Sequence, residues 1–167
     1  MRIRVVTPED ASSVIALFER LYSETSFLLY DAGESTPRVE DYAKRIADGR
    51  ARESFVMLVA ENCDGLIGFT CGARGNARRN RHSLFLVLGV LRSQWHRGVG
   101  RSLLEAIEDW ALAHGIHRLE LTVRMDNERA LQLYEKMGFM REGTKRHSLQ
   151  IEGRFIDEHY MSKLIAA

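Results

Sequence analysis

Hydrophobic residues recur along the chain with two spacings, which divide it into expected helices and strands. Val14, Leu17 and Leu21 recur at steps of three or four residues, which predicts a helix with one buried face. The segment before them, residues 7–10, reads Thr-Pro-Glu-Asp and has the residue types of a helix start. A more polar second helix is expected from about residue 38 to residue 47.

Two more helices and seven strands complete the pattern. The later helices are expected from Gly100 to Gly115 and from Asp126 or Asn127 to Met137. Strands are expected at residues 2–6, 55–60, 66–71, 83–91, 118–123, 139–146 and 153–164. Because residues 83–91 are almost continuously apolar, they predict a central strand covered on both faces. The alternation of elements predicts an α/β fold in one domain, residues 1–167.

Composition narrows the classes of function. The formal net charge of +1 provides no overall field to attract nucleic acid, and the longest apolar run, residues 84–91, is far shorter than a membrane span of about 20 residues. Two cysteines, Cys63 and Cys71, fit a reducing compartment better than a disulfide scaffold. We therefore expect a cytoplasmic protein that binds neither nucleic acid nor membrane. His114 and His117 lack the Cys or Asp companions of a metal site, so no metal is expected.

A glycine-rich turn joins the buried strand to the third helix. Residues 97–102 read Arg-Gly-Val-Gly-Arg-Ser. The first turn of a helix carries N–H groups without intrahelical partners, which attract anions, and glycines let a phosphate approach the backbone closely. The third glycine of the dinucleotide fingerprint is missing, since Leu103 follows, and so is the Gly-Lys-Ser/Thr of nucleotide hydrolases. A pyrophosphate site and a plain strand-to-helix turn both fit.

The segment from Asn127 to Phe139 resembles a known signature. It reads Asn-Glu-Arg-Ala-Leu-Gln-Leu-Tyr-Glu-Lys-Met-Gly-Phe and is similar to the Asn-x-x-Ala-x-x-Leu-Tyr-x-x-x-Gly-Phe pattern of the GNAT N-acetyltransferase superfamily. Val90, eight residues before Gly98, also fits that family, while Trp95 stands where Gln or Arg is usual. The resemblance implies a mixed, splayed sheet of about seven strands flanked by four helices. It also implies an enzyme that uses acetyl-CoA.

The resemblance further implies a path for the cofactor. The backbone of Leu88, Gly89 and Val90 would bind the pantetheine arm, and Asn127 would contact the cofactor from the other side. The N–H groups of the glycine turn would hold the pyrophosphate; these are Arg97, Gly98, Val99, Gly100, Arg101 and Ser102.

Tyr134 is the candidate general acid. In the family its hydroxyl points at the thioester sulfur, although its ring could instead pack as an ordinary core aromatic. The general base stays open, because residues 83–91 contain no carboxylate. The alternatives are Glu24, Asp31, Glu120, Glu158 or a chain of waters.

The acceptor is expected to be a free amino acid or other small amine. Phe27, Tyr30 and Asp31 lie in a loop that commonly lines the acceptor site in this family, although simple packing is equally compatible with the two aromatics. A protein N-terminus or lysine is the alternative acceptor, and a non-catalytic acyl-CoA sensor is the alternative function. The last strands offer an edge that could pair in a homodimer.

Overall fold

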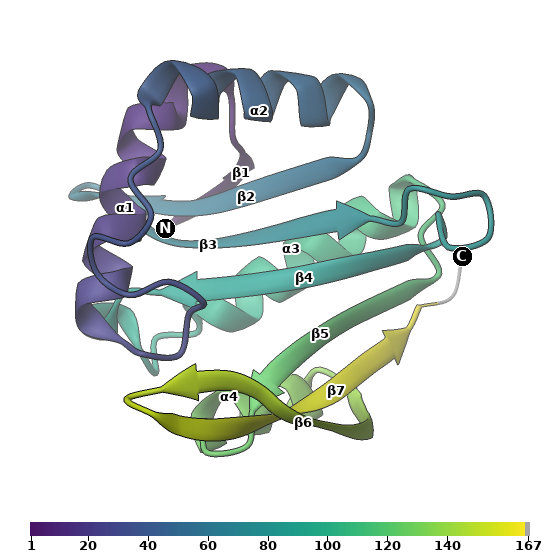
Figure 1. Ribbon diagram of the computed structural model, residues 1–167. Coiled ribbons are helices and arrows are strands. Elements are labelled where there is room, and N and C mark those ends of the chain that lie inside the picture. Colours follow the sequence, from purple (N-terminus) through teal and green to yellow (C-terminus); the bar gives the residue numbers. More distant parts are fainter. Residues whose placement is uncertain (166–167) are drawn as a thin grey trace.

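The computed structural model describes residues 1–165 and contains the expected elements in the expected order (Figure 1). The helices are α1 (Ala11–Glu24), α2 (Val39–Ala51), α3 (Val99–Ala113) and α4 (Glu128–Lys136). The strands are β1 (Arg2–Val5), β2 (Phe55–Asn62), β3 (Gly65–Arg74), β4 (Ser83–Val90), β5 (Arg118–Arg124), β6 (Met140–Ile151) and β7 (Arg154–Leu164). Short 3-10 turns precede α1 at Pro8–Asp10 and follow β4 at Arg92–Gln94. None of the described helices is both long and apolar enough to cross a membrane.

The seven strands form one mixed sheet in the order β1-β2-β3-β4-β5-β7-β6. Every neighbouring pair is antiparallel except β4 and β5, which are parallel. Because α3 connects these two strands, they can run in the same direction side by side. Strand β7 returns between β5 and β6, so β6 forms one outer edge of the sheet.

The parallel pair separates soon after it begins. β4 and β5 are paired only where Ser83–Phe85 lie beside Arg118–Glu120, and the strands diverge beyond that point. The expectation that β4 is covered on both faces was wrong: Phe85 is 37% and Val87 39% exposed. These side chains lie on a face that no helix covers at the divergence, whereas Leu84 and Leu86 on the other face are buried.

Helices cover both faces of the sheet. On β3, Phe69 packs edge-on against Phe18 of α1, with ring centroids 4.9 Å apart, while the neighbouring Gly68 faces Leu103 of α3. Since successive residues of a strand point to opposite faces, α1 and α3 must lie on opposite sides. In Figure 1, α3 and α4 lie behind the sheet and α1 with α2 on the near side. The buried apolar side chains of α3 and of the central strands join in one core.

Candidate active site

A cavity of about 600 Å³ lies where β4 and β5 diverge. Its volume falls within the usual range for small-molecule sites, roughly 300–1,000 Å³. Ten of the fourteen candidate residues line it, namely Phe27, Leu88, Gly89, Val90, Gly98, Val99, Gly100, Arg101, Asn127 and Tyr134. The other four, Tyr30, Asp31, Arg97 and Ser102, do not. The structure therefore gathers residues from three separate segments of the chain around one space.

The end of β4 offers backbone groups to this cavity. The Leu91 N–H bonds to the Ile67 carbonyl of β3 at 3.0 Å. Strand alternation therefore turns the backbone N–H and C=O groups of Val90 and Leu88 away from β3, toward the gap between β4 and β5. The Val90 carbonyl accepts a hydrogen bond from Trp95 Nε1 at 2.8 Å, which leaves its N–H as the group directed into the gap.

Trp95, at the position where the sequence departs from the family pattern, contacts two cations. The Arg129 guanidinium lies 3.1 Å from the centre of its ring and the Arg92 guanidinium 5.4 Å away. Burial is the main cause that lowers the pKa of Arg129, and Arg92 lowers it further. The indole therefore fixes the end of β4 to the start of α4, a contact that sequence reasoning missed because Arg129 lies 34 positions after Trp95 in the chain.

The glycine turn has the backbone of an anion site. Gly98 has φ of 80°, a left-handed conformation that glycine adopts without strain. Gly100 packs so closely that an added Cβ would lie 3.0 Å from Leu133 of α4. Within the helix, the Ser102 N–H donates to the Gly98 carbonyl at 3.0 Å, so the N–H groups without helical partners lie before it. The turn thus presents backbone N–H groups and the Arg101 side chain at the cavity.

Helix α4 brings the proposed acid to the opposite wall. The Asn127 side chain caps the helix by accepting from the Ala130 N–H at 3.3 Å, which agrees with the helix start expected at Asp126 or Asn127. Two turns further along the helix, Tyr134 is 7% exposed and its ring lies 5.7 Å from that of Phe139. Burial raises the pKa of the Tyr134 phenol well above its usual value. The hydroxyl therefore stays protonated at neutral pH, as a proton donor must.

Arg124, at the end of β5, fixes the loop that follows α1. Its Nη1 donates to the Ser26 carbonyl at 2.8 Å, and its guanidinium lies 4.7 Å from the centre of the Phe27 ring. Its Nε and Nη2 donate to the Asp126 carboxylate at 2.9 and 2.6 Å. Phe27 is thereby held at the cavity, on the face of the sheet that carries α1.

The four acidic candidates for the general base occupy different surroundings. Glu24 accepts from the Arg92 N–H at 2.7 Å, and Glu120 accepts from Arg118 Nε at 2.8 Å. Asp31 is exposed on the loop surface and does not line the cavity. Glu158 is buried at 8% exposure and lines it. Among the described residues, Glu158 is the only carboxylate on the cavity wall.

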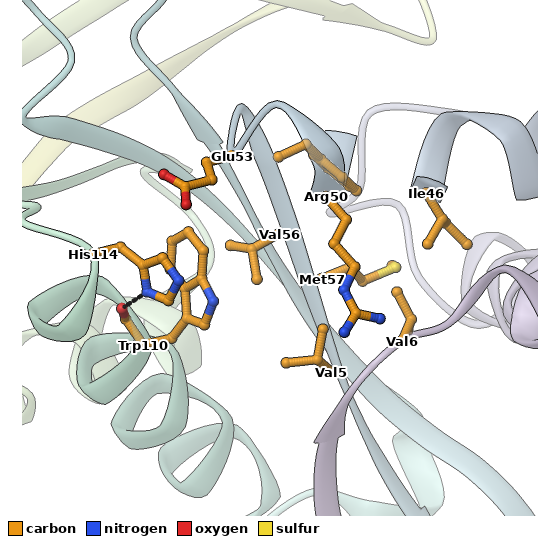
Figure 2. A pocket seen from close by; sticks show the side chains of 10 residues that line it. Val5, Val6, Ile46, Arg50, Glu53, Val56, Met57, Trp110 and His114 are labelled. Atoms are coloured by element: carbon orange, nitrogen blue, oxygen red, sulfur yellow. Dashed lines mark hydrogen bonds between the residues drawn. The ribbon is translucent and has the colours of Figure 1, made fainter. Parts of the chain in front are cut away.

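A second cavity, of about 290 Å³, shares no lining residue with the first (Figure 2). It opens between α2, the end of β1 and α3, and Arg50, Glu53 and His114 supply its polar groups. His114 stacks on Trp110 with ring centroids 3.9 Å apart, and its Nδ1 donates to the Trp110 carbonyl at 2.7 Å. None of the candidate residues lines this cavity, and residues 1–165 contain no cluster of three or more metal-ligating side chains.

Comparisons with known proteins agree on one family. A family model described as the acetyltransferase (GNAT) family matches residues 15–139. The L-amino acid N-acetyltransferase AaaT of Escherichia coli is 32% identical over 130 residues, which cover 74% of this chain and 75% of that protein. The L-methionine sulfoximine/L-methionine sulfone acetyltransferase of Pseudomonas paraeruginosa is 27% identical over 170 residues, a match that covers 95% of this chain and 91% of that protein. A GNAT-family acetyltransferase from Streptococcus pneumoniae superposes with a TM-score of 0.94 at 32% identity, covering 98% of this chain and 99% of that one.

Proposed function

Because the chain belongs to the acetyltransferase (GNAT) family, we propose that it transfers the acetyl group of acetyl-CoA directly to the amine of an amino acid or another small amine. The observation that carries this proposal is the cavity at the divergence of β4 and β5, which joins the glycine turn, the end of β4 and Tyr134. Relatives named as acetyltransferases of amino acids support the acceptor class.

The residues at the cavity fit acetyl-CoA. The turn at Gly98 and Gly100 suits a pyrophosphate, since it combines left-handed backbone, exposed N–H groups and the nearby Arg101. The gap-facing backbone of Leu88 and Val90 suits an amide-bearing arm, which can pair with it as a strand would. When bound, this cofactor supplies an activated acetyl thioester.

The chain's own groups then serve the transfer. The Val90 N–H is directed into the gap and can donate to an oxygen that gains negative charge. The Tyr134 hydroxyl, kept protonated by burial, can donate a proton to a leaving thiolate. Burial raises the pKa of the Cys71 thiol to about 11, and Cys71 does not line the cavity, which favours direct transfer over an acyl-cysteine route.

The experiment that tests this function measures thiol release from acetyl-CoA across a panel of acceptors. The panel contains L-amino acids, including L-methionine sulfone, simple primary amines, and peptides with a free N-terminus or an internal lysine. Thiol release that depends on an amino acid or small amine is the expected result. Release only with peptides would replace the acceptor class, and tight acetyl-CoA binding without turnover would favour a sensor module.

We also propose a cytoplasmic homodimer. β6 is an outer strand of the sheet, which suits pairing with a second copy. Met140 at the start of β6 and Phe155 on the neighbouring strand β7 are exposed. Both cysteines are free thiols, as is usual in the cytosol. A monomeric mass by light scattering at micromolar concentration would refute the dimer, and fractionation of cells that express the chain would test the compartment.

A further inference from the structure

Three charged side chains form a row across β5, β7 and β6. In the strand register, Glu158 lies opposite Arg124 on one side and opposite Lys145 on the other. Residues directly opposite on paired strands share a face of the sheet. That face is the one carrying α1, because Arg124 reaches Ser26 and Phe27 in the loop that follows this helix. All three charged residues line the cavity.

Glu158 is buried and yet has no close donor among the described residues. Arg124 directs its Nε and Nη2 to Asp126 and its Nη1 to Ser26, so its charge is already matched by another carboxylate. The partner of Glu158 is Lys145, whose Nζ lies 3.7 Å from Oε2, beyond ordinary hydrogen-bond distance. No side-chain oxygen of the described residues is both fully buried and unpaired, so the Glu158 carboxylate, which has no close donor, must reach the open space of the cavity that it lines. A ligand with a cationic donor can bind it there.

The two partners differ in depth. The Lys145 side chain is 45% exposed, whereas that of Glu158 is 11% exposed. The positive group is therefore nearer the solvent and the negative group deeper in the wall. A ligand that matches both must carry its cation inward and its anion outward, a few ångströms apart.

We propose that Glu158 and Lys145 bind the two ends of an α-amino acid acceptor, with the ammonium group at Glu158 and the carboxylate at Lys145. This assignment rests on the proposed acetyl transfer to amines. It places the nitrogen that is to react deep in the cavity that Tyr134 also lines. Each contact is a charge-assisted hydrogen bond, which is roughly twice as strong as a neutral one.

The pair also sets specificity. A zwitterion satisfies both side chains, whereas the methyl ester of the same amino acid keeps the ammonium group and loses the anion that faces Lys145. A simple amine likewise engages only Glu158. The protein should therefore prefer a free amino acid to its ester, and that preference should depend on Lys145.

Kinetics of Glu158→Gln and Lys145→Met test the assignment. The acceptor is the L-amino acid with the highest turnover in the panel, or L-methionine sulfone if none reacts, together with its methyl ester. Glu158→Gln should raise the KM for the amino acid roughly 10- to 100-fold, the range expected for loss of a charged hydrogen bond, and leave the KM for acetyl-CoA unchanged. Lys145→Met should raise the KM for the amino acid but not for the ester.

Matched controls separate binding from net charge. Glu152→Gln removes the same charge in the exposed turn between β6 and β7, and Arg146→Met removes the cation next to Lys145; neither residue lines the cavity. Both controls should retain wild-type constants. Thermal melting checks that all four variants remain folded.

Calorimetric titration with the same two acceptors, in the presence of coenzyme A, measures their binding without turnover. A lower affinity for the amino acid in both variants supports the assignment, even if no acetylation occurs. In that case only the proposed function fails. Wild-type affinity in Glu158→Gln, an unchanged preference for amino acid over ester in Lys145→Met, or no amino acid binding by the wild type would overturn the assignment. If neither variant affects amine turnover, the proposed function stands and the assignment of Glu158 and Lys145 fails.

Discussion

Removal of the Tyr134 hydroxyl is the most direct test of the proposed chemistry. Tyr134→Phe keeps the ring, which is buried and packs beside Phe139, and deletes only the oxygen. Burial alone raises the pKa of the Tyr134 phenol, so no charged neighbour is left without its partner when the hydroxyl is lost. The free energy of unfolding should therefore change by no more than about 1 kcal/mol, the net contribution of a typical hydrogen bond.

Turnover should respond very differently. A positioned general acid contributes roughly 10²- to 10⁴-fold to a rate, which corresponds to about 3–5 kcal/mol of barrier. We expect kcat in thiol release to fall by that factor in Tyr134→Phe, while the affinity for acetyl-CoA stays within about twofold because the cavity keeps its shape.

Tyr42→Phe is the matched control, because Tyr42 is also a buried tyrosine but lies on α2, away from this cavity. Burial raises the pKa of the Tyr42 phenol as well, so a high pKa alone does not distinguish the two residues. The control should retain wild-type turnover. If Tyr134→Phe keeps kcat within about threefold of wild type, Tyr134 is not the acid, and the signature tyrosine serves packing alone.

Three further predictions concern the glycine turn, the loop after α1 and acid stability. Gly98→Ala forces alanine to φ of 80°, which costs about 1–2 kcal/mol of stability, and it should weaken acetyl-CoA binding. The control Gly33→Ala, at φ of 82°, should cost similar stability and leave the affinity for acetyl-CoA intact. Equal affinities for acetyl-CoA in the two variants would contradict an anion site at Gly98. Arg124→Met removes the hydrogen bonds to Ser26 and Asp126, so the KM for the acceptor should rise about tenfold while the KM for acetyl-CoA changes little. An unchanged KM for the acceptor would show that other contacts hold the loop that follows α1. The hydrogen bond from Arg4 is the main cause that lowers the pKa of Asp10 to about 2, below the value near 4 of an unfolded chain. The Asp10 carboxylate therefore stabilises the fold fully above pH 4, and this stabilisation is lost as the pH falls through 2. Denaturant unfolding should therefore show Asp10→Asn about 1–2 kcal/mol less stable than wild type at pH 6 and by a shrinking margin toward pH 2, whereas a constant margin would contradict the linkage.

The sequence alone determined the elements and much of the geometry of the glycine turn and of the start of α4. Helical spacing and cap residues are local signals, because a helix satisfies its hydrogen bonds within its own segment. The capping role of Asn127 and the order of all elements were therefore predictable. The two glycines of the turn were predictable for the same reason, since left-handed backbone and close approach are properties of a few neighbouring residues.

Only the tertiary structure decided how β4, β5, β6 and β7 wall the cavity. The exposure of Phe85 and Val87 depends on what packs over that face of β4, which no run of apolar residues reveals. Glu24, Asp31, Glu120 and Glu158 were equivalent candidates in the sequence, and only the folded structure showed that Glu158 alone among them lines the cavity. Because β7 returns between β5 and β6, it places Glu158 beside Arg124 and Lys145, which are 34 and 13 positions away along the chain. Contacts between strands distant in sequence depend on register and sheet order, and these are fixed by the packing of the whole core rather than by any local pattern.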